Sequence, residues 1–155
     1  MEQILVKKGK TVVSDKKGAR LFTVSLGSAL AIAASDPVAH VSGMAVCVLP
    51  KKVDKTSAVP GVLEQLRELF KEMISKGAKP QNLKIFLAGA AGFLSEPDEL
   101  AIGKKLYKAV LVTLKKNGLK TKGEHVGGPL NRTASLHVGG ENMTITMLDE
   151  KEIQL

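Results

Sequence analysis

The chain has 155 residues, 44% apolar and 25% charged, a composition typical of a soluble globular protein that folds as a single domain, residues 1–155. No apolar run approaches the roughly 20 residues that span a bilayer, and residues 1–10 lack the apolar core of a signal peptide, so we expect neither membrane insertion nor secretion. The formal net charge of +8 favours acidic partners, and the single cysteine, Cys47, excludes an internal disulfide framework and indicates a reducing, cytoplasmic location.

Short apolar segments separated by turn residues predict strands in the first third of the chain. Residues 3–13 alternate imperfectly and are rich in Val and Ile, which predicts a strand hairpin that turns at residues 8–10. Three further strands are predicted at residues 21–26, 30–34 and 41–49.

Two amphipathic helices are predicted in the middle of the chain. The first begins near Pro60 and is capped by Gly77, and its apolar face consists of Val62, Leu63, Leu66, Leu69, Phe70, Met73 and Ile74. The second covers residues 98–116, with Ile102, Leu106, Val110 and Leu114 on its apolar face. A buried strand at 83–88 separates the helices, and strands at 133–138 and 143–148, joined by a glycine turn, end the pattern. This order predicts an α+β fold, a mixed β-sheet with two main helices packed on it.

The stretch TVSLGSALAIAASDP, residues 23–37, enters a tight turn and continues as a run of small apolar residues. It is the first of several fragments that together resemble the CheD family of chemoreceptor glutamine deamidases. The family shows Thr-x-x-Leu-Gly-Ser-Cys followed by Asp-Pro. The remaining fragments, in order, are Gly-Met-Ala at 43–45, Gly-Ala at 77–78, Lys-Ile-Phe at 84–86, Ile-Gly at 102–103, and Gly-Gly at 127–128 with Arg132 after it. The family's Asp before that last turn is His125 here. The resemblance covers roughly residues 10–148 and implies the CheD fold.

The resemblance also implies a chemistry for which this chain lacks the reactive groups. In the family, a cysteine attacks the carboxamide of a receptor glutamine, a histidine from the next strand serves as base, and a threonine supports the site. The corresponding positions are Ala29, Val46 and the retained Thr23. We therefore expect no intact catalytic residues, and a former pocket made of Thr23, Gly27, Ser28, Ala29, Val46 and Gly89. A Cys-to-Ala knockout would also give Ala29, but valine is a poor choice for inactivating a histidine.

Other candidate reactive groups have simpler structural explanations. Cys47 follows Val46 in a strand, so its side chain is expected to point away from the pocket into core. Ser28 is expected to stabilise the turn. The three histidines, at positions 40, 125 and 137, have no metal-ligand spacing, so neither a metal site nor a cofactor is expected.

The sequence thus favours a catalytically degenerate CheD-like protein that binds chemoreceptor helices or a CheC-like phosphatase. One alternative is an active protein-glutamine deamidase with a non-standard nucleophile, Cys47 or Ser28. Another is a basic binder of acidic partners. Nucleic acid is disfavoured as a partner because the chain has four Phe, one Tyr and no Trp to stack on bases.

Overall fold

The computed structural model describes residues 2–92, 97, 101–147 and 151–155, and in these residues it contains two five-stranded β-sheets and two α-helices. The elements are β1 (Gln3–Leu5), β2 (Thr11–Ser14), β3 (Arg20–Thr23), β4 (Leu30–Asp36), β5 (Val41–Cys47), α1 (Val62–Ser75), the short 3-10 helix η1 (Pro80–Asn82), β6 (Lys84–Gly89), α2 (Ile102–Lys116), β7 (Gly123–Val126), β8 (Arg132–His137), β9 (Thr144–Met147) and β10 (Glu152–Gln154).

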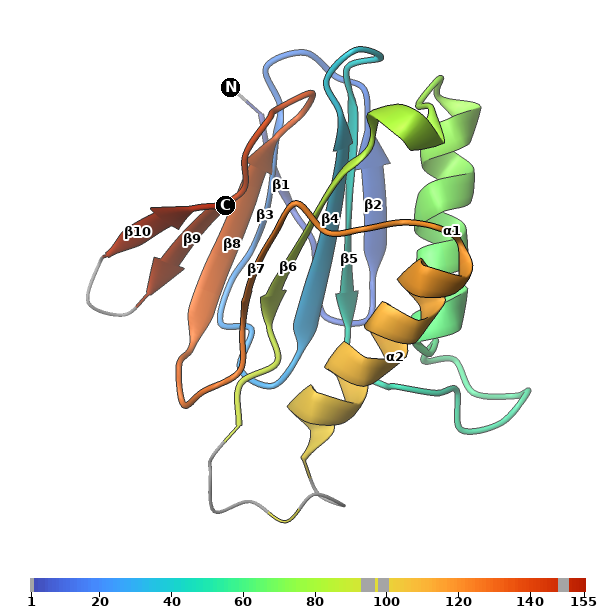
Figure 1. The fold of residues 1–155 in the computed structure, drawn as a ribbon, viewed down its shortest axis with the longest axis vertical. Coiled ribbons are helices and arrows are strands. Elements are labelled where there is room, and N and C mark those ends of the chain that lie inside the picture. Colours follow the sequence, from blue (N-terminus) through green and yellow to red (C-terminus); the bar gives the residue numbers. More distant parts are fainter. Residues whose placement is uncertain (1, 93–96, 98–100, 148–150) are drawn as a thin grey trace.

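The strands form two facing sheets, with orders β1-β3-β8-β9-β10 and β2-β5-β4-β6-β7. Each sheet is mixed, because β1 pairs in parallel with β3, and β6 pairs in parallel with β7, while the other pairs are antiparallel. Both helices cover the outer face of the second sheet (Figure 1). The molecule therefore has three layers: sheet, sheet and helices.

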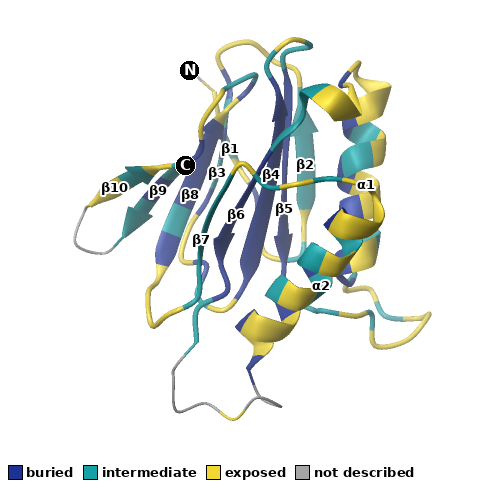
Figure 2. Cartoon of the chain, viewed as in Figure 1, coloured by how far each residue is buried: buried dark blue, intermediate teal, exposed yellow. Residues whose placement is uncertain are grey.

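The central strands β4 and β5 are buried along their whole length, because they have a packed layer on both faces (Figure 2). Alternate residues point to opposite faces of a strand. In β4, Leu30 and Ile32 join the core under the helices, whereas Ala31 and Ala33 join the core between the two sheets. Strands buried on both sides read as continuous apolar runs, which is why this segment showed no polar alternation.

The predicted α+β class is confirmed, but the strands form two sheets rather than one. The predicted hairpin over residues 3–13 is wrong: β1 pairs with β3 in the first sheet, and β2 pairs with β5 in the second. The chain crosses between the sheets at residues 6–10, where the Val6 amide donates to the Phe22 carbonyl at 2.8 Å and the Gly9 amide donates to the Val46 carbonyl at 2.7 Å. Partners distant in the sequence thus override the local turn signal.

Two short strands, β7 and β10, were not predicted. Their sequences, GEHV and EIQ, hold only one apolar residue each, and they are strands because they extend the edges formed by β6 and β9. The predicted second helix began at residue 98, whereas α2 begins at Ile102; residues 98–100 lie outside the described residues.

The two helices are placed by close contacts at their ends. At the start of α1 the Gly61 amide donates to the Glu64 carboxylate at 2.9 Å. At the start of α2 a Cβ on Gly103 would lie 2.5 Å from the Ala90 carbonyl oxygen, so only glycine lets α2 approach the loop that follows β6.

No helix in the described ranges is both long and apolar enough to cross a membrane.

Candidate functional site

The three positions at which the resemblance leads us to expect the family's catalytic residues come from both sheets. Thr23 ends β3 in the first sheet, whereas Ala29 precedes β4 and Val46 lies in β5 of the second sheet. The β4–β5 register sets Ala31 opposite Val46, so Ala29 and Val46 share the strand face that looks at the first sheet. Both belong to the apolar core between the sheets.

These positions are closed to solvent and chemically inert. Ala29 is 4% exposed, Val46 is 0% exposed and Thr23 is 2% exposed. The side chains at positions 29 and 46, where the resemblance leads us to expect the nucleophile and the base, are a methyl group and an isopropyl group. Neither can attack a carboxamide carbon or carry a proton, and both contribute to packing instead.

Cys47 lies on the opposite face of β5 from Val46, as its position in the sequence predicted. It belongs to the core under the helices, together with Leu30 and Ala45. The thiol is fully buried, and this burial raises the pKa of Cys47 to about 12. A thiolate is therefore strongly disfavoured at neutral pH, and Cys47 does not reach the face on which Ala29 lies.

The backbone around Ala29 is tightly folded. The Ala29 amide donates to the Leu26 carbonyl at 2.9 Å, and the Ala29 carbonyl accepts from the Ala90 amide at 2.8 Å. Gly89 has a φ of +115°, and a Cβ there would lie 2.2 Å from the Ala29 carbonyl oxygen. Glycine at position 89 is therefore required by a close approach of two backbone segments.

Two non-glycine residues beside Ala29 adopt left-handed backbone conformations. Ser25 has a φ of +48° and Ala90 a φ of +53°. Such conformations cost of order 1–3 kcal/mol each, and they persist only where surrounding contacts hold them. Ser28, three residues after Ser25, is exposed at the surface of the turn.

Hydrogen bonds join three loops around Ala29, residues 24–29, 89–92 and 127–132, which we call the three-loop framework. The Ala91 amide donates to the Gly27 carbonyl at 3.0 Å, and the Gly92 amide donates to the Gly128 carbonyl at 3.0 Å. Asn131 links the first and third loops: its Oδ1 accepts from the Gly27 amide at 2.9 Å, and its Nδ2 donates to Ser25 Oγ at 3.2 Å. The sequence reasoning missed Asn131, although an asparagine in a turn is a known mimic of backbone hydrogen bonding.

Arg132 lies buried at the centre of this framework. Its guanidinium donates from Nη1 to the Gly89 carbonyl at 2.9 Å and from Nη2 to the Gly127 carbonyl at 2.5 Å. Its Nε donates to Nδ1 of His125 at 2.7 Å. Burial lowers the pKa of Arg132 from its ordinary value. One cation thus fixes the loops that follow β6 and β7.

His125 replaces the carboxylate that the family resemblance implies beside this arginine. Burial, and then the charge of Arg132, lower the pKa of His125 below its usual 6.5. Because Nδ1 accepts a hydrogen bond from a cation, the ring is neutral and carries its proton on Nε2. His125 therefore serves as a structural acceptor for Arg132 in this arrangement, a contact that the sequence spacing did not predict.

The three histidines lie in different elements: one in the β4–β5 turn, one in β7 and one in β8. Across the described ranges no group of three or more His, Cys, Asp or Glu side chains has an arrangement that could hold a metal ion.

Comparison with known proteins yields a consistent set of relatives. The family model described as CheD chemotactic sensory transduction matches residues 52–147, a segment that begins after Thr23, Ala29 and Val46. A probable chemoreceptor glutamine deamidase CheD 1 from Syntrophus aciditrophicus is 32% identical over 143 residues, covering 89% of each chain. A probable chemoreceptor glutamine deamidase CheD from Syntrophotalea carbinolica is 32% identical over 145 residues, 89% of this chain and 90% of that protein.

A chemoreceptor glutamine deamidase CheD from Thermotoga maritima is 33% identical over 120 residues, covering 76% of this chain and 75% of that protein. Among solved structures, a hypothetical protein YfiH from Bacillus licheniformis superposes with a TM-score of 0.49 at 14% identity, over 76% of this chain and 49% of that one. The family match and the extended identity to its members together show that this chain belongs to the CheD family of chemotaxis proteins.

Proposed function

We propose that this CheD-family protein does not deamidate glutamine and acts in the cytoplasm by binding chemoreceptors or a CheC-type phosphatase. The observation that carries the proposal is the pair Ala29 and Val46, which stand where the family's nucleophile and base are expected and pack into the core between the sheets.

The chemistry explains why the loss is complete. Deamidation by this family requires a thiolate to attack the carboxamide carbon, expel ammonia and form a thioester, which water then hydrolyses. A base must accept the thiol proton and return a proton to the leaving nitrogen. In subtilisin, another covalent hydrolase, removing the catalytic residues lowers kcat by about 10⁶-fold. A chain with neither group is therefore expected to show no useful turnover.

The three-loop framework supports a binding role. Ser25 and Ala90 hold strained backbone conformations, and Arg132 is buried to tie these loops together. This arrangement costs stability and shapes a surface at one end of β4, around the exposed Val24 and Ser28. A surface of fixed shape can still dock a partner after its reactive groups are gone.

No observation favours a substitute nucleophile. Cys47 lies on the other face of β5 with a raised thiol pKa. Ser28 would need a free base, and Nδ1 of His125 is already engaged by Arg132.

Binding can be tested with two matched variants at opposite ends of β4. Val24→Asp alters an exposed valine of the first loop, 49% exposed, and Val38→Asp alters an exposed valine of the far turn, 80% exposed. We expect a glutamine-containing chemoreceptor fragment or a purified CheC-type phosphatase to bind the parent and the Val38→Asp variant equally in isothermal titration calorimetry. Val24→Asp should weaken binding by about ten-fold, since it sets a charge within the docking surface. Absence of binding to both partners, or equal binding by both variants, would contradict the proposal.

A further inference from the structure

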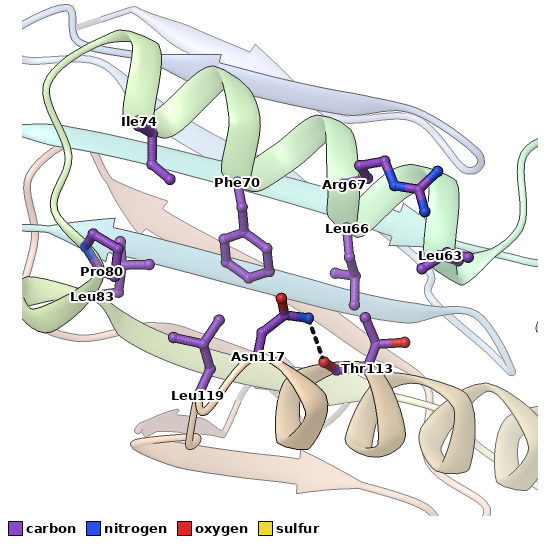
Figure 3. A pocket seen from close by; sticks show the side chains of 10 residues that line it. All are labelled: Leu63, Leu66, Arg67, Phe70, Ile74, Pro80, Leu83, Thr113, Asn117 and Leu119. Carbon is purple, nitrogen blue, oxygen red and sulfur yellow. Dashed lines mark hydrogen bonds between the residues drawn. The ribbon is translucent and has the colours of Figure 1, made fainter.

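A groove of about 350 Å³ runs between α1 and α2 on the helix-covered side of the molecule (Figure 3). The second sheet separates this groove from the core between the sheets, which contains Ala29 and Val46. Its occupant is therefore independent of the function proposed above.

The groove is lined mostly by apolar side chains, and α1 presents them at helical spacing. Leu63, Leu66, Phe70 and Ile74 follow each other at intervals of three and four residues along one edge of α1. Leu63 is 48% exposed and Ile74 is 52% exposed, so part of this apolar stripe on α1 is accessible to solvent. Pro80, Leu83 and Leu119 close one end, as Figure 3 shows. A stripe of this kind, open to solvent between two helices, matches the contact that a third helix would make.

The charge on the α2 side of the groove is strongly one-sided, whereas α1 carries three glutamates beside its two cations. Residues 102–122 contain no Asp or Glu, and they include seven exposed lysines: Lys104, Lys105, Lys108, Lys115, Lys116, Lys120 and Lys122. Lys116 follows the groove residue Thr113 by three positions, so it lies beside Thr113 on the surface of α2. Arg67 lines the groove from α1. Both long edges of the groove thus carry a cation.

The apolar lining and the cations at both edges of the groove favour one kind of occupant. We propose that the groove between α1 and α2 binds an acidic amphipathic helix of another protein, with its apolar stripe on Leu66 and Phe70 and its carboxylates facing Arg67 and Lys116. The apolar contact supplies affinity, and the charges set orientation and speed association.

The other occupants fit less well. Single-stranded nucleic acid needs stacking platforms, and Phe70 is the one aromatic side chain among the residues that line the groove. A second copy would present its own lysine-rich α2: helices α1 and α2 together carry seven basic side chains against three acidic ones, so two such faces repel.

The test uses two fluorescent peptides of about 18 residues, long enough for five helical turns. Both carry leucines at three- and four-residue spacing; one has glutamates on the flanks and the other has lysines there. Fluorescence anisotropy should show that the glutamate peptide binds about ten-fold more tightly than the lysine peptide, and that added salt weakens its binding.

Matched variants place that binding in the groove. Ile74→Glu and Lys116→Glu should each weaken glutamate-peptide binding by about ten-fold. The controls, Val38→Glu and Lys17→Glu, change exposed residues outside the groove and should leave binding within about two-fold. Circular dichroism of all four variants verifies that they are folded.

The proposal is overturned if the two peptides bind alike, or if the groove variants bind as the controls do. It is equally overturned if a single-stranded oligonucleotide or anionic vesicles displace the peptide at lower concentration than unlabelled peptide does. Light scattering that shows a dimer dissociated by Ile74→Glu would assign the groove to a second copy instead.

Discussion

Replacing Gly89 by alanine tests how the backbone around Ala29 is held. Two costs add at this position. An L-residue with a left-handed φ loses roughly 1–2 kcal/mol, and the φ of Gly89 is +115°. A Cβ would also lie 2.2 Å from the Ala29 carbonyl oxygen, a backbone atom that cannot swing away. Relieving an overpacked contact typically costs about 1–3 kcal/mol more.

The shift would also disturb hydrogen bonds that meet at Gly89. Its carbonyl accepts from Arg132 at 2.9 Å and from the Gly127 amide at 2.9 Å, and the neighbouring Ala90 amide donates to the Ala29 carbonyl at 2.8 Å. We therefore expect Gly89→Ala to lower the free energy of unfolding by about 2–5 kcal/mol.

Gly118→Ala is the matched control. Gly118 has a φ of +67°, and no atom lies within 4 Å of the position where its Cβ would be. It should cost only the backbone contribution, about 1–2 kcal/mol. Urea unfolding followed by circular dichroism measures both. If Gly89→Ala destabilises no more than Gly118→Ala, the close approach of these two backbone segments is not what requires glycine at position 89.

Three further predictions concern groups outside this close approach. The pKa of His125 is lowered in the folded protein, so the unfolded chain binds the proton more readily, and the free energy of unfolding should decrease as the pH drops below about 6.5. His125→Asn, which keeps an acceptor for Arg132, should reduce this dependence on pH. The same dependence on pH in both proteins would exclude His125 as its source. Asp36→Ala should cost about 2–3 kcal/mol in urea unfolding, since the carboxylate accepts three backbone amides at 2.8–2.9 Å; a loss below about 0.5 kcal/mol would show that water replaces it. Cys47 should react with a disulfide-exchange reagent only at the rate of unfolding, so fast labelling of the native protein would refute its burial.

The alternation of side chains along single strands was readable from the sequence. It correctly set Val46 and Cys47 on opposite faces of β5, and the three- and four-residue spacing correctly located α1. Both patterns depend on neighbours within one element, where geometry fixes which residues share a face.

Features that depend on distant partners were not readable. The division into two sheets arises because β1 and β2 each pair with a strand farther along the chain, which no local pattern specifies. The contact of Arg132 with His125 likewise requires β7 and β8 to be placed in separate sheets that meet at the three-loop framework. The resemblance pointed to Gly89, Gly127 and Arg132 as positions in the chain. Only the fold shows that the Arg132 guanidinium joins the two glycines by donating to their carbonyls.

We propose that this CheD-family protein has no deamidase activity, because Ala29 and Val46 stand where the nucleophile and the base are expected, and that it retains the three-loop framework around them. The most direct test measures ammonia release from a glutamine-containing chemoreceptor fragment, with the Thermotoga maritima CheD protein as the positive control. We predict that the parent chain releases no ammonia above background, and that a folded Ala29→Cys, Val46→His double variant does. Ammonia release by the parent chain would contradict the loss of catalysis, and a folded but silent double variant would contradict the retention of the framework.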